Sequence, residues 1–268
     1  MSAPHGSLLR RLFAGSGMQQ IFDIGACSGT EGIRYASMFP QAELHAFEPV
    51  VANHSLVLEN FSQHPELRAQ AHCVALSDQA GTAVLNLSSA QGEMGRHGNK
   101  SSSLLEPGRA TEVFPWLEFN ERITVPTRTL DDFCAEHAIA AIDLIHMDVQ
   151  GAELMVLRGA SSMLPHIRTV WMEVERIPLY LDQPVKQEVE AFMTGNGFDL
   201  VISTVGRTAG DQFWVNRAFA GQQPFSVRSS MFLRSWEWRI RMAWQNLRWR
   251  LGQAFRGTRP GRKLSGSS

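Results

Sequence analysis

Two short apolar segments of this sequence each end beside a carboxylate, and a helix-like stretch follows each of them. Residues 19–24 contain Asp23 next to a turn that carries Gly25, and residues 42–47 are followed directly by Glu48. Short apolar strands that alternate with helices predict a parallel sheet covered on both faces. The carboxyl ends of neighbouring strands in such a sheet line the crevice where ligands bind. We therefore expect Asp23 and Glu48 to face one ligand.

The alternation continues along most of the chain, which fits one α/β domain over residues 19–220 after an N-terminal segment at 1–18. Further strands are expected at 69–76, 82–87, 121–127, 142–147, 169–174, 198–203 and 212–217, and helices at 31–39, 49–60, 152–159 and 186–194. Thr129 is expected to cap a further helix, because Asp132 stands three residues after it.

Residues 88–120 interrupt this pattern. They are rich in glycine and serine and show no clear periodicity. A stretch of this length is a functional loop or a disordered surface segment. As a loop over the crevice it would bring Lys100 and Ser102 to a polar acceptor.

The first candidate motif spaces Asp23, Gly25 and Gly29 around the turn after the first strand. Glycines there let backbone amides approach a ligand closely. The dinucleotide pattern of three glycines would also need glycine at positions 27 and 30, where Cys27 and Thr30 stand. The carboxylate suits a cationic ligand such as an ammonium or a sulfonium, or it caps a helix or pairs with an arginine.

The second candidate motif follows the apolar strand at 142–147. Asp148 ends this strand, and Glu153 opens the next helix near its positive end. Glu173, in the next strand, is expected at a comparable depth. Together Asp148 and Glu173 could act as a general base or hold a divalent cation, although no third metal ligand is evident. His146 should point to the same sheet face as Asp148, since strand side chains alternate.

These motifs resemble those of the FkbM-type S-adenosylmethionine-dependent methyltransferases, from Ile21 to about Phe219. The likeness is carried by residues 23–26 (DIGA), 47–49 (FEP), 75–78 (ALSD), 129–132 (TLDD) and 147–153 (MDVQGAE). It implies a class I methyltransferase fold, a Rossmann-like three-layer sandwich around a mostly parallel seven-stranded sheet with one antiparallel strand. It also implies O-methylation of a hydroxyl on a sugar, a glycolipid or a polyketide-like metabolite.

The resemblance further implies a role for individual residues. The cofactor-binding residues would be Asp23, Gly25, Ala26 and Gly29 around the methionine part, Glu48 on the ribose hydroxyls, and Ser77 with Asp78, of which Asp78 would approach the adenine. Asp148, Gln150 and Glu153 would face the transfer site, with Asp148 as the first choice of base and Glu173 as the second. The sequence departs from the family at Cys27, where asparagine is frequent, and at His146, where lysine is usual.

The C-terminal segment at 228–268 differs from the rest of the chain in charge. It holds ten basic residues against the single acid Glu237, a net charge of +9, so that residues 1–227 carry −10. Between Leu233 and Phe255 apolar residues recur at intervals of three and four, and four of the seven tryptophans fall among the arginines. This predicts a basic amphipathic helix. Residues 228–263 would contact a membrane surface, the acidic body or a second subunit, and nucleic acid is disfavoured by the charge of the body.

Two functions besides methyl transfer remain open from the sequence. One is a nicotinamide-dinucleotide-dependent oxidoreductase on a similar sheet, and the other is a non-catalytic cofactor-binding scaffold tethered through its tail. The three cysteines form no C-x-x-C pair, and no apolar stretch is long enough for a signal peptide or a membrane span. We therefore expect reduced thiols in a cytoplasmic protein, with peripheral membrane contact as one role of the tail.

Overall fold

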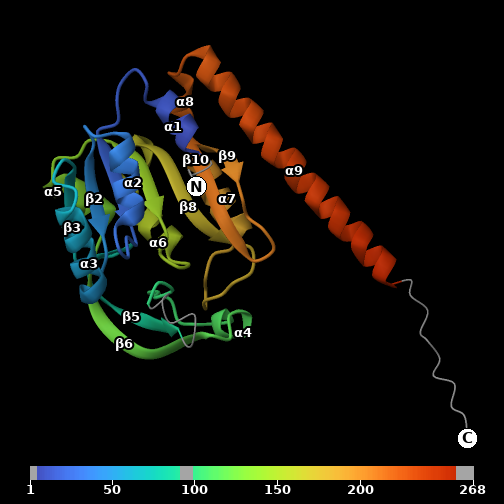
Figure 1. Ribbon diagram of the computed structural model, residues 1–268, viewed down its shortest axis with the longest axis horizontal. Helices are drawn as coiled ribbons and strands as arrows, with labels where there is room; N and C mark the ends of the chain where they lie inside the picture. The colour runs from blue at the N-terminus through green and yellow to red at the C-terminus, as the bar shows by residue number, and fades with distance from the viewer. Residues whose placement is uncertain (1–4, 91–98, 258–268) are drawn as a thin grey trace, which may run out of the picture.

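A seven-stranded sheet forms the centre of the protein in this computed structural model, which describes residues 5–90 and 99–257 (Figure 1). Its strand order is β3-β2-β1-β7-β8-β10-β9. The strands are β1 (Gln20–Ile24), β2 (Glu43–Phe47), β3 (Arg68–His72), β7 (Ile142–Met147), β8 (Ile167–Glu175), β9 (Phe198–Ser203) and β10 (Ala209–Asn216). All neighbouring pairs are parallel except those of β10, which runs antiparallel to β8 and β9. The expected class I methyltransferase topology is confirmed.

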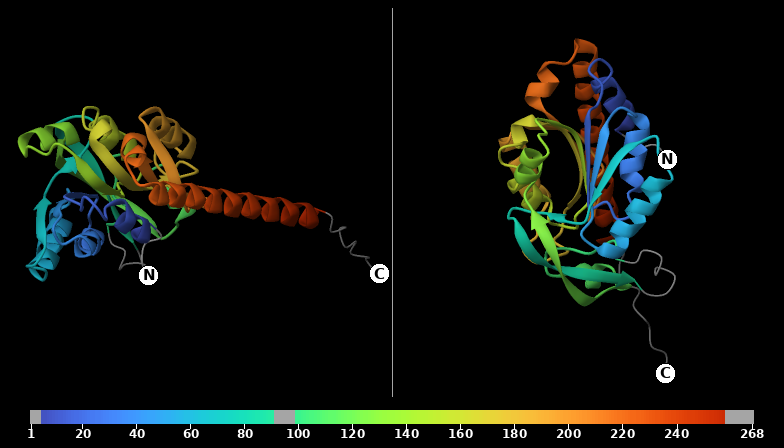
Figure 2. Two further views of the ribbon diagram at one scale, coloured as in Figure 1. Left: turned by 90° about the horizontal axis from the view of Figure 1, so that it is seen from above. Right: turned by 90° about the vertical axis from the view of Figure 1, so that its left-hand side faces the viewer.

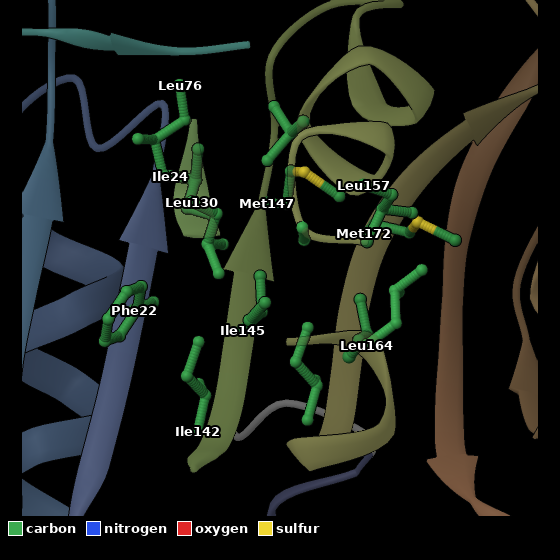
Figure 3. Close-up of a cluster of buried hydrophobic side chains, with 14 of the residues drawn as sticks. Phe22, Ile24, Leu76, Leu130, Ile142, Ile145, Met147, Leu157, Leu164 and Met172 are labelled. Atoms are coloured by element: carbon green, nitrogen blue, oxygen red, sulfur yellow. The ribbon is translucent and has the colours of Figure 1, made fainter. Parts of the chain in front are cut away.

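Helices cover both faces of this sheet and complete the three layers (Figure 2). One face packs against α5 (Leu130–Glu136), α6 (Glu153–Arg158) and α7 (Lys186–Gly195). Side chains from β1, β7 and α6 meet in this layer, among them Phe22, Ile145 and Leu157 (Figure 3). The other face packs against α1 (Gly6–Leu12), α2 (Thr30–Met38), α8 (Arg217–Gly221) and the start of α9 (Phe225–Gly257), with α3 (Val51–Ser62) at its margin.

Two helices show how local sequence and packing share control of the fold. The start of α5 is set by its own sequence, because the Thr129 hydroxyl accepts a hydrogen bond of 3.0 Å from the Asp132 amide. The helix α1 was not expected within residues 1–18. Its leucines Leu8 and Leu9 are fully buried against the sheet, and a seven-residue helix depends on such packing more than on propensity.

A second, three-stranded sheet covers the carboxyl end of the main sheet. It has the order β4-β6-β5, formed by β4 (Ala75–Leu76), β5 (Gly81–Ala90) and β6 (Leu117–Arg128). The single strand expected at 69–76 was therefore wrong: the chain turns at Val74, whose amide bonds the His72 carbonyl at 3.0 Å, and divides it into β3 and β4.

The expectation that residues 88–120 lack regular structure was also wrong in part. In the described part of this range, β5 continues to Ala90, α4 occupies Ala110–Val113 and β6 begins at Leu117. An isolated bridge between Asn86 and Ser103 ties the intervening loop to β5. Residues 91–98 lie outside the described part of the chain.

The predicted C-terminal helix is present as α9 and extends away from the body of the protein (Figures 1 and 2). It begins at Phe225, three residues before the expected start. Val227 and Met231 of its first turns are buried against the sheet layer. The Arg11 guanidinium of the N-terminal region bonds the Ser226 carbonyl at 2.8 Å and the Ser230 hydroxyl at 2.9 Å.

Candidate active site

A cavity opens where the carboxyl ends of β1, β2 and β7 face the small sheet. It is lined by Ile24, Gly25, Cys27, Phe47, Glu48, Pro49, Val50, Asn53, Val74, Ala75, Leu76, Leu85, Asn99, Lys100, Ser102, Leu104, Asp148, Val149 and Ala152. Five of the residues expected from the sequence are among them: Gly25, Glu48, Lys100, Ser102 and Asp148. The strand-end argument therefore points to the edge of the sheet where this cavity lies.

The turn after β1 lies directly against the end of β7. Gly25 has a φ of 80°, and a β-carbon added to it would lie 2.0 Å from the Asp148 carbonyl oxygen. The amides of Gly25 and Ala26 both donate to the Phe47 carbonyl at 3.0 Å, and the Asp148 amide donates to the Ile24 carbonyl at 3.0 Å. These bonds fix the floor of the cavity, and only glycine fits position 25 without moving it.

Glu48 is held in a fixed position at the end of β2. Its two carboxylate oxygens accept hydrogen bonds from the Cys27 amide at 2.8 Å and from the Val50 amide at 2.9 Å. Burial raises the pKa of Glu48, and these two amides act in the opposite direction. A carboxylate oxygen has a second lone pair, so that Glu48 can still accept hydrogen bonds from ligand hydroxyls.

Asp23 lies behind the cavity rather than in its wall. Its carboxylate is buried, and its oxygens accept a hydrogen bond from the Gly32 amide at 2.9 Å and contact the His146 ring nitrogen Nδ1 at 2.8 Å. Burial alone would lower the pKa of His146, but the hydrogen bond and the charge of Asp23 raise it. The structure therefore shows Asp23 joining α2 to β7. This agrees with the alternative that Asp23 caps a helix, except that its second partner is a histidine and not an arginine.

The other residues expected around the methionine part support the turn from outside the cavity wall. Ala26 is packed with Ala46 and Val57. Gly29 has a φ of 74° at the start of α2, where a β-carbon would lie 3.1 Å from Val57. Neither lines the cavity.

Ser77 and Asp78 do not reach the cavity either. Ser77 is buried with its carbonyl against Gly159, and Asp78 is exposed. The wall on this side is apolar and consists of Val74, Leu76 and Leu85. Sequence reasoning missed these residues, because their position depends on the division of the expected strand and on the small sheet.

A group of carboxyl side chains adjoins the far end of the cavity, at the ends of β7 and β8. The Gln150 amide nitrogen donates to Asp148 Oδ1 at 2.7 Å and to Glu173 Oε2 at 3.0 Å, so that one side chain bridges the two. Burial, followed by the charges of Asp148 and Glu175, raises the pKa of Glu173 to about 9. Burial likewise raises the pKa of Glu175 to about 7.

Glu153 holds the turn that carries Asp148 and Gln150. Its Oε1 accepts hydrogen bonds from the Val149 amide at 3.2 Å and the Gly151 amide at 3.3 Å. It is buried, and its pKa is raised by burial and by the charge of Glu175. Gln150 has a φ of 54° and Gly151 a φ of 95° in this turn. Glu153 therefore positions the residues of the site and does not line the cavity.

The loop before α4 is anchored on Gln150. The Ser103 hydroxyl donates to the Gln150 carbonyl at 2.7 Å. The Tyr180 hydroxyl donates to the Ser101 carbonyl at 2.7 Å and lies 3.2 Å from Gln150 Oε1. Lys100 and Ser102 are thereby brought to the cavity wall. Tyr180 carried no signal in the sequence, since a lone tyrosine after a strand forms no motif.

The donor set of the cavity fits a sulfonium nucleoside. Glu48 offers a carboxylate for ribose hydroxyls, the apolar wall of Val74, Leu76 and Leu85 suits an adenine ring, and Asp148 supplies negative charge beside a cation. Within residues 5–90 and 99–257 no group of three or more His, Cys, Asp or Glu side chains is arranged to hold a metal ion.

Known proteins with similar sequences are methyltransferases. The 2-O-methyltransferase NoeI of Sinorhizobium fredii is 34% identical over 163 residues, which are 61% of this chain and 66% of NoeI. The 31-O-demethyl-FK506 methyltransferase FkbM of Streptomyces tacrolimicus is 29% identical over 195 residues, 68% of this chain and 73% of that protein.

Two solved methyltransferase structures are similar to this one at low sequence identity. TrmK of M. capricolum in complex with S-adenosyl-homocysteine has a TM-score of 0.44 and 9% identity, covering 81% of this chain and 69% of that chain. The precorrin-6y C5,15-methyltransferase of Geobacter metallireducens has a TM-score of 0.42 and 7% identity, covering 79% and 87%.

A family model described as the methyltransferase FkbM domain matches residues 23–200, about two thirds of the sequence. This range includes all residues that line the cavity and the cluster of carboxyl side chains beside it. The chain belongs to the FkbM family of S-adenosylmethionine-dependent methyltransferases.

Proposed function

We propose that this protein transfers a methyl group to a hydroxyl of a sugar, a glycolipid or a polyketide-like metabolite. The observation that carries the proposal is the position of Asp148, which lines the same cavity as Glu48 and is bridged through Gln150 to the partly buried carboxyl of Glu173. The names of the relatives NoeI and FkbM describe methylation at oxygen, which supports a hydroxyl acceptor here as well.

The cofactor side of the cavity is formed by residues with separate tasks. Gly25 allows the backbone at Asp148 to approach closely, Glu48 would bind the ribose hydroxyls, and Val74, Leu76 and Leu85 would pack against the adenine. Bound S-adenosylmethionine supplies a methyl group activated by its sulfonium. Asp23 keeps the turn in position through α2 and His146.

The acceptor side would use Asp148 as the general base. A sugar hydroxyl is a weak nucleophile at neutral pH, and a carboxylate that accepts its proton accelerates the transfer. Glu173, with its pKa raised to about 9, is protonated at neutral pH and suits the role of a hydrogen-bond donor. Gln150 orients both carboxyl groups, so that the acceptor is held in near-attack geometry.

The test uses the full chain with S-adenosylmethionine carrying an isotopically labelled methyl group. It is incubated with a panel of acceptors that contains free sugars, glycolipids and polyketide alcohols, each paired with its deoxy analogue. The proposal requires label in a hydroxyl-bearing acceptor and none in its deoxy partner. Label on nitrogen, carbon or sulfur would contradict the hydroxyl assignment.

Ligand binding separates this proposal from the two alternatives left by the sequence. A ligand that binds only the native state raises the melting temperature. We expect S-adenosylhomocysteine to do so and NAD(H) not to. Stabilisation by S-adenosylhomocysteine without methyl transfer to any acceptor in the panel would favour the non-catalytic scaffold.

A further inference from the structure

The first half of α9 has a face that nothing in the described structure covers. Its side chains at Val227 and Met231 are buried against the body, whereas five large apolar side chains are exposed. These are Phe225 (82% exposed), Phe232 (63%), Leu233 (62%), Trp236 (52%) and Ile240 (47%). We call these five residues the α9 stripe. Figures 1 and 2 show the helix leaving the body along most of its length.

The α9 stripe lies on the side of the helix away from its buried residues. With 3.6 residues per turn, its five members fall within an arc of about 100°, opposite the side of the helix that carries Val227 and Met231. The helix therefore docks on the body with one side of its first turns and presents a continuous apolar stripe on the other. The largest contiguous apolar patches on soluble proteins usually mark an interaction site.

Arginines border the α9 stripe on one side. On a helical projection Arg228 and Arg239 fall within about 40° of one edge of the stripe, whereas Arg234 and Arg241 lie toward the opposite side of the helix, where Arg234 donates to the Ser7 hydroxyl. Arg228 and Arg239 also line a groove between α9 and the edge strand β9, together with Phe225 and Phe232 of the stripe. Apolar and cationic groups thus lie side by side on one surface of the helix.

The sequence continues this pattern beyond the described side chains. Trp244, Leu247, Leu251 and Phe255 keep the intervals of three and four, and residues 228–268 carry a net charge of +9. No helix in the described part of the chain is long and apolar enough to cross a membrane. A helix of this kind lies in the plane of a bilayer interface.

We propose that α9 docks the protein on an anionic phospholipid surface, with the α9 stripe in the acyl boundary and the bordering arginines among the headgroups. Each basic residue near such a surface adds attraction, and tryptophan prefers the interface. This inference concerns a surface separate from the active-site cavity and does not depend on the acceptor.

Charge favours lipid over the other occupants of such a face. Two copies of a segment with a net charge of +9 repel each other, which opposes pairing of α9 with itself. A nucleic acid would use the arginines but would leave the α9 stripe in water. An anionic bilayer satisfies the stripe and the arginines together.

The test is co-sedimentation of the full chain with vesicles of phosphatidylcholine alone or mixed with phosphatidylserine. We expect binding to the mixed vesicles that weakens in high salt, and little binding to phosphatidylcholine. The double variant Leu233→Ser with Trp236→Ser should bind at least about tenfold more weakly, because two large apolar groups no longer leave water. A matched control is Leu56→Ser with Leu58→Ser, two similarly exposed leucines of α3, which should bind like the wild type.

Further readouts make the result decisive. Stabilisation by S-adenosylhomocysteine in all variants shows that each is folded, and light scattering reports the oligomeric state. The proposal is overturned if the wild type ignores anionic vesicles, if the α9 variant binds them undiminished, or if that variant instead dissociates a dimer. Equally strong binding of the wild type and the α9 variant to duplex RNA, with no vesicle binding, would assign the arginines to nucleic acid.

Discussion

The backbone carbonyl of Asp148 occupies the space where a side chain at residue 25 would begin, 2.0 Å from the β-carbon position of Gly25. The two residues are far apart in the sequence, yet β1 and β7 are parallel neighbours and end side by side. The contact joins the turn beneath the cofactor side of the cavity to the residue proposed as the base. A displacement of either turn therefore moves the other.

The substitution Gly25→Ala should damage both stability and cofactor binding. The new methyl group meets a backbone atom that cannot rotate away, and the φ of 80° is strained for alanine. We expect a loss of at least about 2 kcal/mol in the free energy of unfolding and no stabilisation by S-adenosylhomocysteine. Gly195→Ala is the control, since nothing lies within 4 Å of its β-carbon position and its φ is not positive. Equal denaturation midpoints for the two variants would refute this account.

The substitution Glu48→Gln should weaken cofactor binding more than it weakens the fold. The amide keeps one acceptor oxygen, but its NH₂ group faces the amide of Cys27 or Val50 and cannot accept from a ribose hydroxyl. Losing a hydrogen bond to a charged group predicts binding about tenfold to hundredfold weaker. Calorimetric titration with S-adenosylhomocysteine measures the change in affinity. The control is Glu59→Gln, at an exposed position of α3. Unchanged affinity would remove Glu48 from the cofactor site.

The sequence predicts the main sheet well because its signals are local. Strands β1, β2 and β7 are short, largely apolar runs that end beside a polar residue or a glycine turn, whereas β3 is mostly polar and half-exposed. The break between β3 and β4 escaped prediction because it falls at Cys73 and Val74, and neither is a glycine or proline that would mark a turn. The helix α1 escaped prediction because its burial comes from the sheet and from Arg11 contacts with α9.

The site was predictable where a side chain follows the end of its strand, and less so within a strand. Glu48 and Asp148 both follow their strands and both line the cavity. Asp23 lies inside β1, in register with His146, and its side chain is held on the α2 side of the sheet. Tyr180 depends on the loop that contacts it and could not be found from sequence spacing.

The free energy of unfolding should fall as the pH rises, in part because of the carboxyl side chains of Glu173 and Glu175 beside the cavity. The pKa of Glu173 is raised from 4.5 to about 9 and that of Glu175 to about 7. Between the ordinary pKa of 4.5 and its raised native value, each of these side chains keeps a proton that it has released in the unfolded chain. Rising pH therefore favours unfolding until the native pKa is passed. Melting temperatures between about pH 5 and pH 9 should decline more steeply for the wild type than for the double variant Glu173→Gln with Glu175→Gln. Parallel curves would show that neither group retains its proton in the native state.

Asp148 and Glu173 are bridged by one amide but should respond in opposite ways to neutral substitution. Asp148→Asn removes the proposed proton acceptor, and we expect turnover to fall at least about a hundredfold, within the usual range for general base catalysis. Glu173→Gln replaces a carboxyl that is protonated at neutral pH by another uncharged donor, so that turnover should fall less than about tenfold. Binding of S-adenosylhomocysteine, measured in parallel, should change little in either variant. If Glu173→Gln instead lost activity while Asp148→Asn kept it, the base would be Glu173 and the pKa of Glu173 would have to fall when the acceptor binds.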